Sequence, residues 1–377
     1  MFSVYQHWDP LRVCIVGRSY TPSFYSWIKN PKLRNLFERI ATETEEDFQN
    51  IINVLESFGV TTLRPDLPLD NFKNNAYLKP PMTPRDHMVM IGNVFYETAS
   101  TNFSKLTYND IKASAWPDCN SWQEFNQLPD WIKRECNEIF NFGNNQTVGH
   151  EYDKIISYIK QQGNIVKSGQ SYVNGAMVAR VGKDLYFGTD SPTVDQNKLS
   201  TQINSEFTNT RNHIVNTGGH SDATYCPVCP GLIISLHDVP TYADTFPGWE
   251  VVYLPGQSWK LVAPFLHLKH RNQGRWWIPG HEYDNDLINL VETWLNHWVG
   301  YVEETVFDIN MLIIDPKNVM VFNYNKQVFD ALARYNITPH IVPFRHRYFW
   351  DGGIHCVTTD LHREGTMQDY SLWRSTL

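Results

Sequence analysis

The sequence Asp351-Gly-Gly-Ile-His-Cys-Val-Thr-Thr-Asp360 places Cys356 shortly after a pair of glycines and directly after His355. Two adjacent glycines indicate that the backbone turns tightly here or approaches another group closely. A single cysteine after such a pair is most often buried and inert. The chemistry of Cys356 therefore depends on what the rest of the chain provides.

Three more segments carry side chains suited to chemistry. A cysteine and a distant histidine, His220, on glycine-flanked loops are the parts of a thiolate nucleophile and its acid–base partner. The carboxylates of Asp86 and Asp222 suit a planar cation with several N–H donors. The three segments are residues 84–86, 172–184 and 218–224.

Composition narrows the classes of function. The 377 residues include 32 Lys and Arg and 40 Asp and Glu, a net charge of −8, which argues against a nucleic-acid binder. A hydrophobic content of 42% with 19% charged residues is typical of a globular protein. No apolar run approaches the roughly 20 residues that a bilayer requires. Residues 1–16 contain Asp9 and no basic segment, so we expect no secretion signal and a cytoplasmic protein.

The six cysteines are too few for a disulfide framework in a chain of this length. Cys226 and Cys229 form a C-x-x-C pair, but no second pair stands at the spacing of a zinc site. We expect these two to be small buried thiols.

Short apolar runs alternate with helical periodicity along the chain, which predicts an α/β fold. Residues 190–212 are polar, which favours a surface loop or a helix on the rim. The Trp-rich segment 256–300 is expected to contribute mainly to packing, with a role in covering the substrate left open. Strands are predicted at 11–17, 60–65, 89–95, 165–167, 185–187, 232–236, 251–253, 311–314, 319–322 and 341–342, and helices at 43–58, 152–160 and 328–335.

The order Pro-Arg-Asp (84–86), His-x-Asp-Ala-Thr (220–224) and Gly-Gly-x-His-Cys-x-Thr (352–358) resembles the amidinotransferases, the glycine amidinotransferase group of the superfamily that modifies guanidino groups. The resemblance covers residues 80–100 and 165–240, and it is strongest over 308–366. It implies a pentein fold, in which five ββαβ-type units surround a pseudo-five-fold axis and the active site lies in the central channel. Since the motifs must then meet in one site, we expect a single domain, 1–377.

The resemblance also implies roles for individual residues. Cys356 would attack the guanidinium carbon, and His220 would protonate the departing amine and deprotonate the incoming one. Asp86 and Asp222 would hold the guanidinium through charge-assisted hydrogen bonds. The expected partners are a guanidine donor, L-arginine in the first instance, and an amine acceptor, with no metal or organic cofactor and with a homodimer left open. Arg85, Asp308, His355 and Gly219 complete the expected substrate-binding set, and for His355 a packing role is an equal alternative.

The chain departs from the family pattern at several positions. Asn174 stands where an acidic residue normally orients the catalytic histidine, and Val239 stands where glycine amidinotransferases carry an arginine for the donor carboxylate. Gly219 replaces a larger apolar residue, and Asp308 replaces a small polar one. A wider, more acidic pocket favours an acceptor with an extra amine or hydroxyls over glycine.

Two other functions stay open at this point. A guanidine hydrolase would use the same residues and resolve the amidino-cysteine with water. A catalytically silent binding protein on the same fold would explain Asn174. Against this last alternative, Cys356, His220, Asp86 and Asp222 are all present.

Overall fold

The computed structural model describes residues 1–68, 72–73, 76–98, 150–169, 172–189, 196–217, 220–236, 248–254, 278, 281, 284–295, 298, 308–350 and 352–370. Within these residues the chain forms five three-stranded sheets and one separate two-stranded pair. In each three-stranded sheet the middle strand is antiparallel to one neighbour and parallel to the other. This repeated arrangement agrees with the expected five ββαβ-type units.

The strands of each unit have the following bounds. The first unit contains β17 (Thr358–Arg363), β1 (Leu11–Val16) and β2 (Thr61–Leu63), and the second contains β5 (Met88–Ile91), β6 (Val94–Thr98) and β7 (Ile165–Gly169). The third contains β8 (Val178–Val181), β9 (Asp184–Thr189) and β10 (Arg211–Asn216), and the fourth contains β11 (Tyr225–Cys229), β12 (Leu232–Ser235) and β13 (Glu250–Tyr253). The fifth contains β14 (Leu312–Asp315), β15 (Asn318–Val321) and β16 (Thr338–Ile341), and the separate pair is β3 (Phe72–Lys73) and β4 (Ala76–Tyr77).

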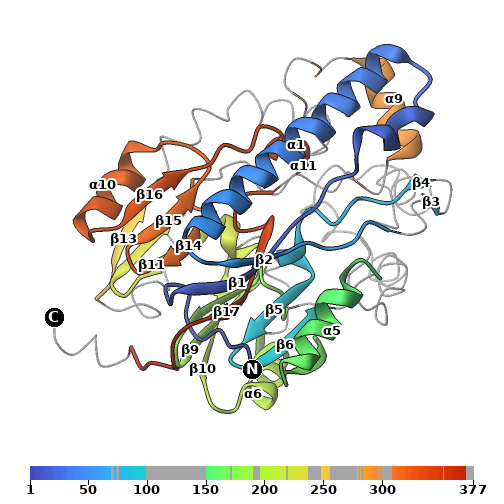
Figure 1. Ribbon diagram of the computed structural model, residues 1–377. Helices are drawn as coiled ribbons and strands as arrows, with labels where there is room; N and C mark the ends of the chain where they lie inside the picture. Colours follow the sequence, from blue (N-terminus) through green and yellow to red (C-terminus); the bar gives the residue numbers. More distant parts are fainter. Residues whose placement is uncertain are drawn as a thin grey trace, which may run out of the picture.

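Helices connect the parallel strands of four units and lie on the outside of the molecule, around the strands (Figure 1). They are α1 (Pro31–Ser57), α5 (Asp153–Gln161), α6 (Gln196–Glu206) and α10 (Lys326–Arg334). Two further helices are α9 (Asn285–Trp294) and α11 (Arg347–Trp350). The 3-10 turns are η1 (Pro22–Trp27), η2 (Pro84–Asp86), η4 (His150–Tyr152) and η5 (Ser221–Ala223). Over the described residues, no helix is both long and apolar enough to cross a bilayer.

Helix α1 begins twelve residues before the predicted start at residue 43. Asn30 caps its N-terminus, with Oδ1 accepting the backbone N–H of Lys32, and Pro31 occupies the first turn. The buried stripe then continues from Leu33 to Leu55, so the helix packs one face along its whole length.

The first unit takes strands from both ends of the chain. β17 pairs antiparallel with β1, with Cys14 opposite Asp360, and β1 pairs in parallel with β2. Strands of different units also pack together. The edge strand β17 contacts β5, the edge strand β8 contacts β11, and β1, the middle strand of the first unit, contacts β14. These contacts bring the loops that precede the first strands of the units towards one another.

Several strands differ from the prediction. β8, β10, β11 and β17 were not expected, and the strand predicted at 341–342 is instead Thr338–Ile341. The polar stretch 190–212 contains the rim helix α6, as expected, and its last two residues begin β10. Of the Trp-rich segment, Trp298 is buried against Tyr20 and Trp350, in agreement with packing, whereas Trp259, Trp276 and Trp277 lie outside the described residues.

Candidate active site

A candidate active site is built from the loops that immediately precede the first strands of the five units. Each of these loops contributes a polar or nucleophilic side chain shortly before the first strand of its sheet. Asp86 precedes β5, Asn174 precedes β8, His220 and Asp222 precede β11, Asn310 precedes β14, and Cys356 precedes β17. The pseudo-symmetry of the fold therefore gathers residues that are up to 270 positions apart, as the contacts below show.

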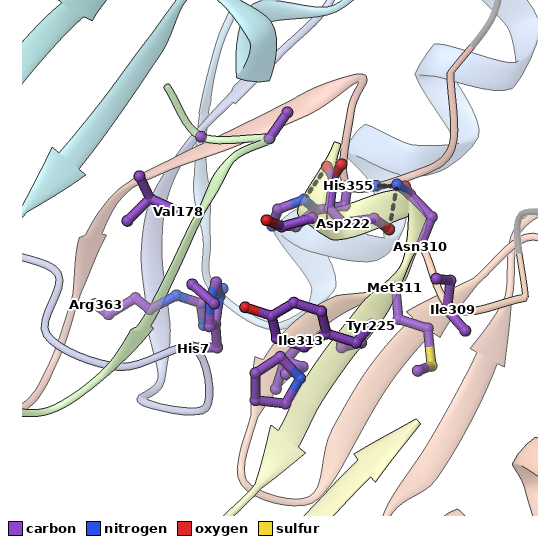
Figure 2. A pocket seen from close by; sticks show the side chains of 16 residues that line it. His7, Val178, Asp222, Tyr225, Ile309, Asn310, Met311, Ile313, His355 and Arg363 are labelled. Atoms are coloured by element: carbon purple, nitrogen blue, oxygen red, sulfur yellow. Dashed lines mark hydrogen bonds and ion pairs between the residues drawn. The ribbon is translucent and has the colours of Figure 1, made fainter. Parts of the chain in front are cut away.

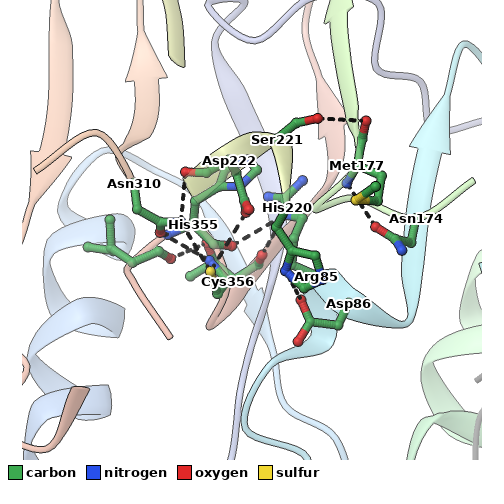
Figure 3. Close-up of polar contacts among 12 residues, drawn as sticks. Arg85, Asp86, Asn174, Met177, His220, Ser221, Asp222, Asn310, His355 and Cys356 are labelled. Carbon is green, nitrogen blue, oxygen red and sulfur yellow. Dashed lines mark hydrogen bonds and ion pairs between the residues drawn. The ribbon is translucent and has the colours of Figure 1, made fainter. Parts of the chain in front are cut away.

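Cys356 is almost fully buried, with 1% of its surface exposed. Asn310 Nδ2 donates to its Sγ at 3.1 Å, and Asp222 Oδ2 lies 3.7 Å from the same sulfur (Figure 3). The backbone N–H of Arg85 donates to the carbonyl of Cys356. The thiol is therefore held between a donor amide and a carboxylate.

The carboxylate of Asp222 is oriented by His355, whose Nδ1 lies 2.7 Å from Asp222 Oδ2. Burial, with the cation of Arg85 as the next cause, holds the pKa of His355 well below its ordinary value, so the ring is neutral. A neutral imidazole in this geometry can donate Nδ1–H to the carboxylate of Asp222. This contact places His355 behind Asp222, as a support for the carboxylate that is expected to bind the guanidinium.

His220 lies on the more open side of the site. Its Nδ1 is 3.9 Å from Asp86 Oδ1, and the two side chains are 30% and 28% exposed. Both are far more accessible than Cys356, which is 1% exposed.

The side chain of Asn174 is used by its own turn. Its Oδ1 accepts the backbone N–H of Met177 at 2.8 Å, and Figure 3 shows it beside Met177 while Asp86 faces His220. The carboxylate that faces the catalytic histidine candidate thus comes from the loop before β5.

Arg85 was expected to bind substrate, and its placement corrects that prediction. Its side chain is fully buried and forms an ion pair with Asp360, with Nη1 2.7 Å from Oδ1. It also donates Nε–H to the carbonyls of His355 and Thr358. The buried side chain of Arg85 therefore supports the loop that carries Cys356.

Two other buried arginines, Arg180 and Arg363, share the same carboxylate. Burial opposes the ionisation of Asp360, but Arg180, Arg85 and Arg363 together hold its pKa well below its ordinary value. Burial lowers the pKa of Arg180 to about 10, so it also remains charged at neutral pH. Three cations around one anion leave a positive charge beneath the loop of Cys356.

A small cavity of about 30 Å³ adjoins the Asp222–His355 pair. Figure 2 shows Asp222, His355 and Asn310 on one side of it, with His7 and Tyr225 on the other. Its volume accommodates about two water molecules, which is too little for a guanidino substrate. Cys356 and His220 do not line it, so it lies behind the site.

The remaining predicted residues are placed as follows. Asp308 accepts a hydrogen bond from Asn323, near the start of β14. Gly219 and Val239 lie outside the described residues. Asn310 was not predicted at all, although its position before β14 matches that of the other site residues before their strands.

Three other cysteines lie in the described part of the chain. Cys14, Cys226 and Cys229 are free thiols, and burial raises the pKa of each to about 12. Of the C-x-x-C pair, Cys229 is buried as expected, whereas Cys226 is only partly buried. Among the described residues, no three His, Cys, Asp or Glu side chains are grouped as a metal site would require.

Comparison with known proteins shows which proteins this chain resembles. No family model matches the chain. The glycine amidinotransferase, mitochondrial, of Xenopus tropicalis is 23% identical over 97% of this chain and 84% of its own length. An L-arginine:L-lysine amidinotransferase of Pseudomonas savastanoi is 24% identical over 40% of this chain and 32% of its own length.

Solved structures identify the fold. An amidinotransferase of the saxitoxin biosynthetic pathway from Microseira wollei superposes with a TM-score of 0.60 at 18% identity, over 98% of this chain and 99% of that one. The inosamine-phosphate amidinotransferase of Streptomyces griseus gives 0.58 at 16% identity, over the same shares of both chains. The fold is the pentein fold, and the chain is similar over nearly its whole length to the glycine amidinotransferases, at 21–23% identity.

Proposed function

We propose that this protein is an amidinotransferase, which moves an amidino group from a guanidine donor to an amine acceptor. L-Arginine is the donor that we expect. The observation that carries this proposal is the position of Cys356 Sγ 3.7 Å from the Asp222 carboxylate. A guanidinium paired with that carboxylate has its carbon within reach of the sulfur.

In the first half-reaction the Cys356 thiolate attacks the guanidinium carbon and a C–S bond forms. The C–N bond to the departing amine then breaks, and His220 donates the proton that this amine requires. Asp86 favours the imidazolium form of His220 that donates it. The product is an amidino-thioether on Cys356 and a free amine, ornithine when the donor is arginine.

In the second half-reaction an acceptor amine takes the place of the departed one. His220, now neutral, removes a proton from the incoming amine, which attacks the amidino carbon. A new C–N bond forms, the C–S bond breaks, and the sulfur leaves as the thiolate. The cycle predicts ping-pong kinetics.

The remaining assignments are proposals of the same kind. The whole chain, 1–377, is proposed to form one domain, since site residues come from loops throughout the described sequence. Asp308 is proposed to border the acceptor pocket and to favour an acceptor with an extra amine or hydroxyls. Location in the cytoplasm and a homodimer stay predictions.

The proposal is tested with arginine labelled at the guanidino carbon and a panel of amines that includes glycine, lysine and amino-cyclitols. Transfer predicts a labelled new guanidine and an equal amount of ornithine, both lost in Cys356→Ala. Ammonia and a ureido product formed without any added amine would instead identify a hydrolase. The absence of any labelled product across donors and acceptors would contradict both reactions and support a binding protein.

A further inference from the structure

Asn310 occupies a central position among the site residues. It lies just before β14, and its side chain is 1% exposed. Its Oδ1 accepts the backbone N–H of His355 at 2.7 Å and that of Cys356 at 3.4 Å. Its Nδ2 donates to Cys356 Sγ at 3.1 Å and to the carbonyl of Asp222 at 3.2 Å. One amide thus connects the nucleophile, its own loop and the loop that is expected to bind the guanidinium.

The orientation of this amide follows from its partners. An amide oxygen accepts and an amide NH₂ only donates. If the group were flipped, the NH₂ would face the backbone N–H of His355, and two donors would oppose each other in a buried place. The loop backbone therefore holds the NH₂ group towards the sulfur.

A donor in this position acts on the charge state of the nucleophile. A thiolate accepts a stronger hydrogen bond than a thiol does, so the N–H of Asn310 favours the thiolate. The nearby carboxylate of Asp222 acts in the opposite sense, because two adjacent anions repel each other. Among the described residues, the charged or titratable groups that border Cys356 include Asp222 from η5, Arg85 from η2 and His355 from its own loop.

The Gly-Gly pair of the nucleophile loop makes room for this contact. A Cβ atom on Gly353 would lie 2.2 Å from Asn310 Oδ1, a distance that no side chain tolerates. Glycine at this position lets the loop close onto the amide of Asn310. The Gly-Gly pair that drew attention to Cys356 in the sequence therefore also provides the space that the side chain of Asn310 needs.

We propose that Asn310 is a catalytic residue, which stabilises the Cys356 thiolate through Nδ2–H and aims the sulfur at the substrate held by Asp222. This inference rests on the proposed role of Cys356 as the nucleophile. The inference adds Asn310 to the residues that activate the nucleophile, and it explains why glycine precedes the Cys356 segment at position 353.

The test is the pH dependence of Cys356 alkylation by iodoacetamide, followed by peptide mass, which needs no guanidine substrate. Asn310→Asp keeps an oxygen for the two backbone N–H groups but replaces the donor with a carboxylate. Asn310→Ala removes the donor without adding charge. Asn325→Asp is the matched control, because it makes the same change at a buried helix cap that tolerates aspartate, where Asn325 accepts two backbone N–H groups of α10.

We expect the alkylation midpoint of Asn310→Asp to rise by about one pH unit or more, which below the wild-type midpoint slows alkylation about tenfold. Asn310→Ala should shift it in the same direction by less, and Asn325→Asp should leave it unchanged. Circular dichroism identifies the variants that fold. If Asn310→Ala does not fold, the alkylation midpoint of Asn310→Asp alone decides the inference. An unchanged midpoint in folded Asn310→Asp overturns the inference. A shifted midpoint in a protein that transfers no amidino group would refute the proposed function and the catalytic role of Asn310, and would leave only its stabilisation of the Cys356 thiolate.

Discussion

His220 Nδ1 lies 3.9 Å from Asp86 Oδ1, across the loops that precede β11 and β5. This contact places a carboxylate next to His220, in a chain where Asn174 stands at the position that is normally acidic in the family. Asp86 provides a negative charge next to His220, while the amide of Asn174 supports the turn at Met177. Asp86 Oδ1 is also buried and has no hydrogen-bond partner among the described residues, so it is available to a substrate or to a closer approach of His220.

The first prediction concerns this pair. Asp86→Asn should lower kcat/KM by about 10² to 10⁴, because a similar change beside a catalytic histidine costs about 10⁴ in a serine protease. Loss of charge should lower kcat through His220 and raise KM through weaker guanidinium binding. Steady-state kinetics measures both. Asp66→Asn, which removes a surface carboxylate paired with Lys154, is the control and should have no effect.

The companion prediction concerns Asn174→Asp. Its carboxylate can accept the same N–H from Met177, and His220 already has Asp86, so kcat/KM should stay within about tenfold of the wild type. A gain of a hundredfold or more in the same assay would show that Asp86 does not fill the role of the missing acid.

Another prediction tests the glycines of the nucleophile loop. Gly353→Ala forces a Cβ to within 2.2 Å of Asn310 Oδ1, whereas the Cβ of Gly352→Ala meets Thr83 Cγ2 at 3.1 Å. Gly353→Ala should therefore lower the free energy of unfolding by about 1–3 kcal/mol and slow alkylation of Cys356. Gly352→Ala, the matched control, should be milder in urea denaturation. Equal losses of unfolding free energy in the two variants would mean that contact with Asn310 is not the reason for glycine at position 353.

The buried arginine cluster predicts a large loss of stability in Asp360→Asn. Arg85, Arg180 and Arg363 would then share a buried space without their counter-charge, and breaking a buried ion pair in this way costs about 3–5 kcal/mol. Glu364→Gln, which removes an exposed partner of Arg12 only four residues away, should have a much smaller effect. Urea denaturation compares the two, and similar losses would contradict the proposed importance of the cluster.

Acid stability should depend on buried neutral histidines. Burial, followed by the charge of Arg180, holds the pKa of His7 well below its ordinary value of 6.5, and burial with Arg85 does the same for His355. The unfolded chain takes up protons at these histidines as pH falls below 6.5, whereas the native protein does not. Stability should therefore fall with decreasing pH, by up to about 1.4 kcal/mol per unit for each histidine.

The measurement is the free energy of unfolding between pH 5 and pH 7. His7→Gln can still accept the N–H of Arg180 and should reduce the slope, while His150→Gln, at an exposed position, should not. A slope unaltered by His7→Gln would show that His7 does not contribute to the acid sensitivity. Asp360 titrates far below this window, because its pKa is held well below its ordinary value.

The sequence indicated most of the middle strands of the units because these are short and uniformly apolar. It did not indicate β17, in which Thr358, Thr359, Asp360 and Arg363 are buried polar residues. The burial of Asp360 depends on its ion pairs with Arg85 and Arg180 from distant parts of the chain, which hydrophobic periodicity cannot detect. The early start of α1 could have been predicted from Asn30 and Pro31, which form a capping signal.

The site residues likewise divide into those that the sequence indicated and one that it did not. Cys356, His220, Asp86 and Asp222 were found through local motifs that resemble a family. Asn310 has no motif of its own, and its importance depends on three partners from two other loops. The signal that could have found it is the five-fold repetition, because it occupies the loop before a unit's first strand, as Cys356 does.

The central claim is that Cys356 carries the amidino group during transfer. The most direct test incubates the protein with arginine in the absence of an acceptor, quenches in acid, and maps the peptide that contains Cys356 by mass spectrometry. The account predicts the added mass of one amidino group on Cys356, absent in Cys356→Ala and removed when an acceptor amine is supplied before the quench. An unmodified Cys356 with every guanidine donor tested, in protein whose Cys356 still reacts with iodoacetamide, would contradict it.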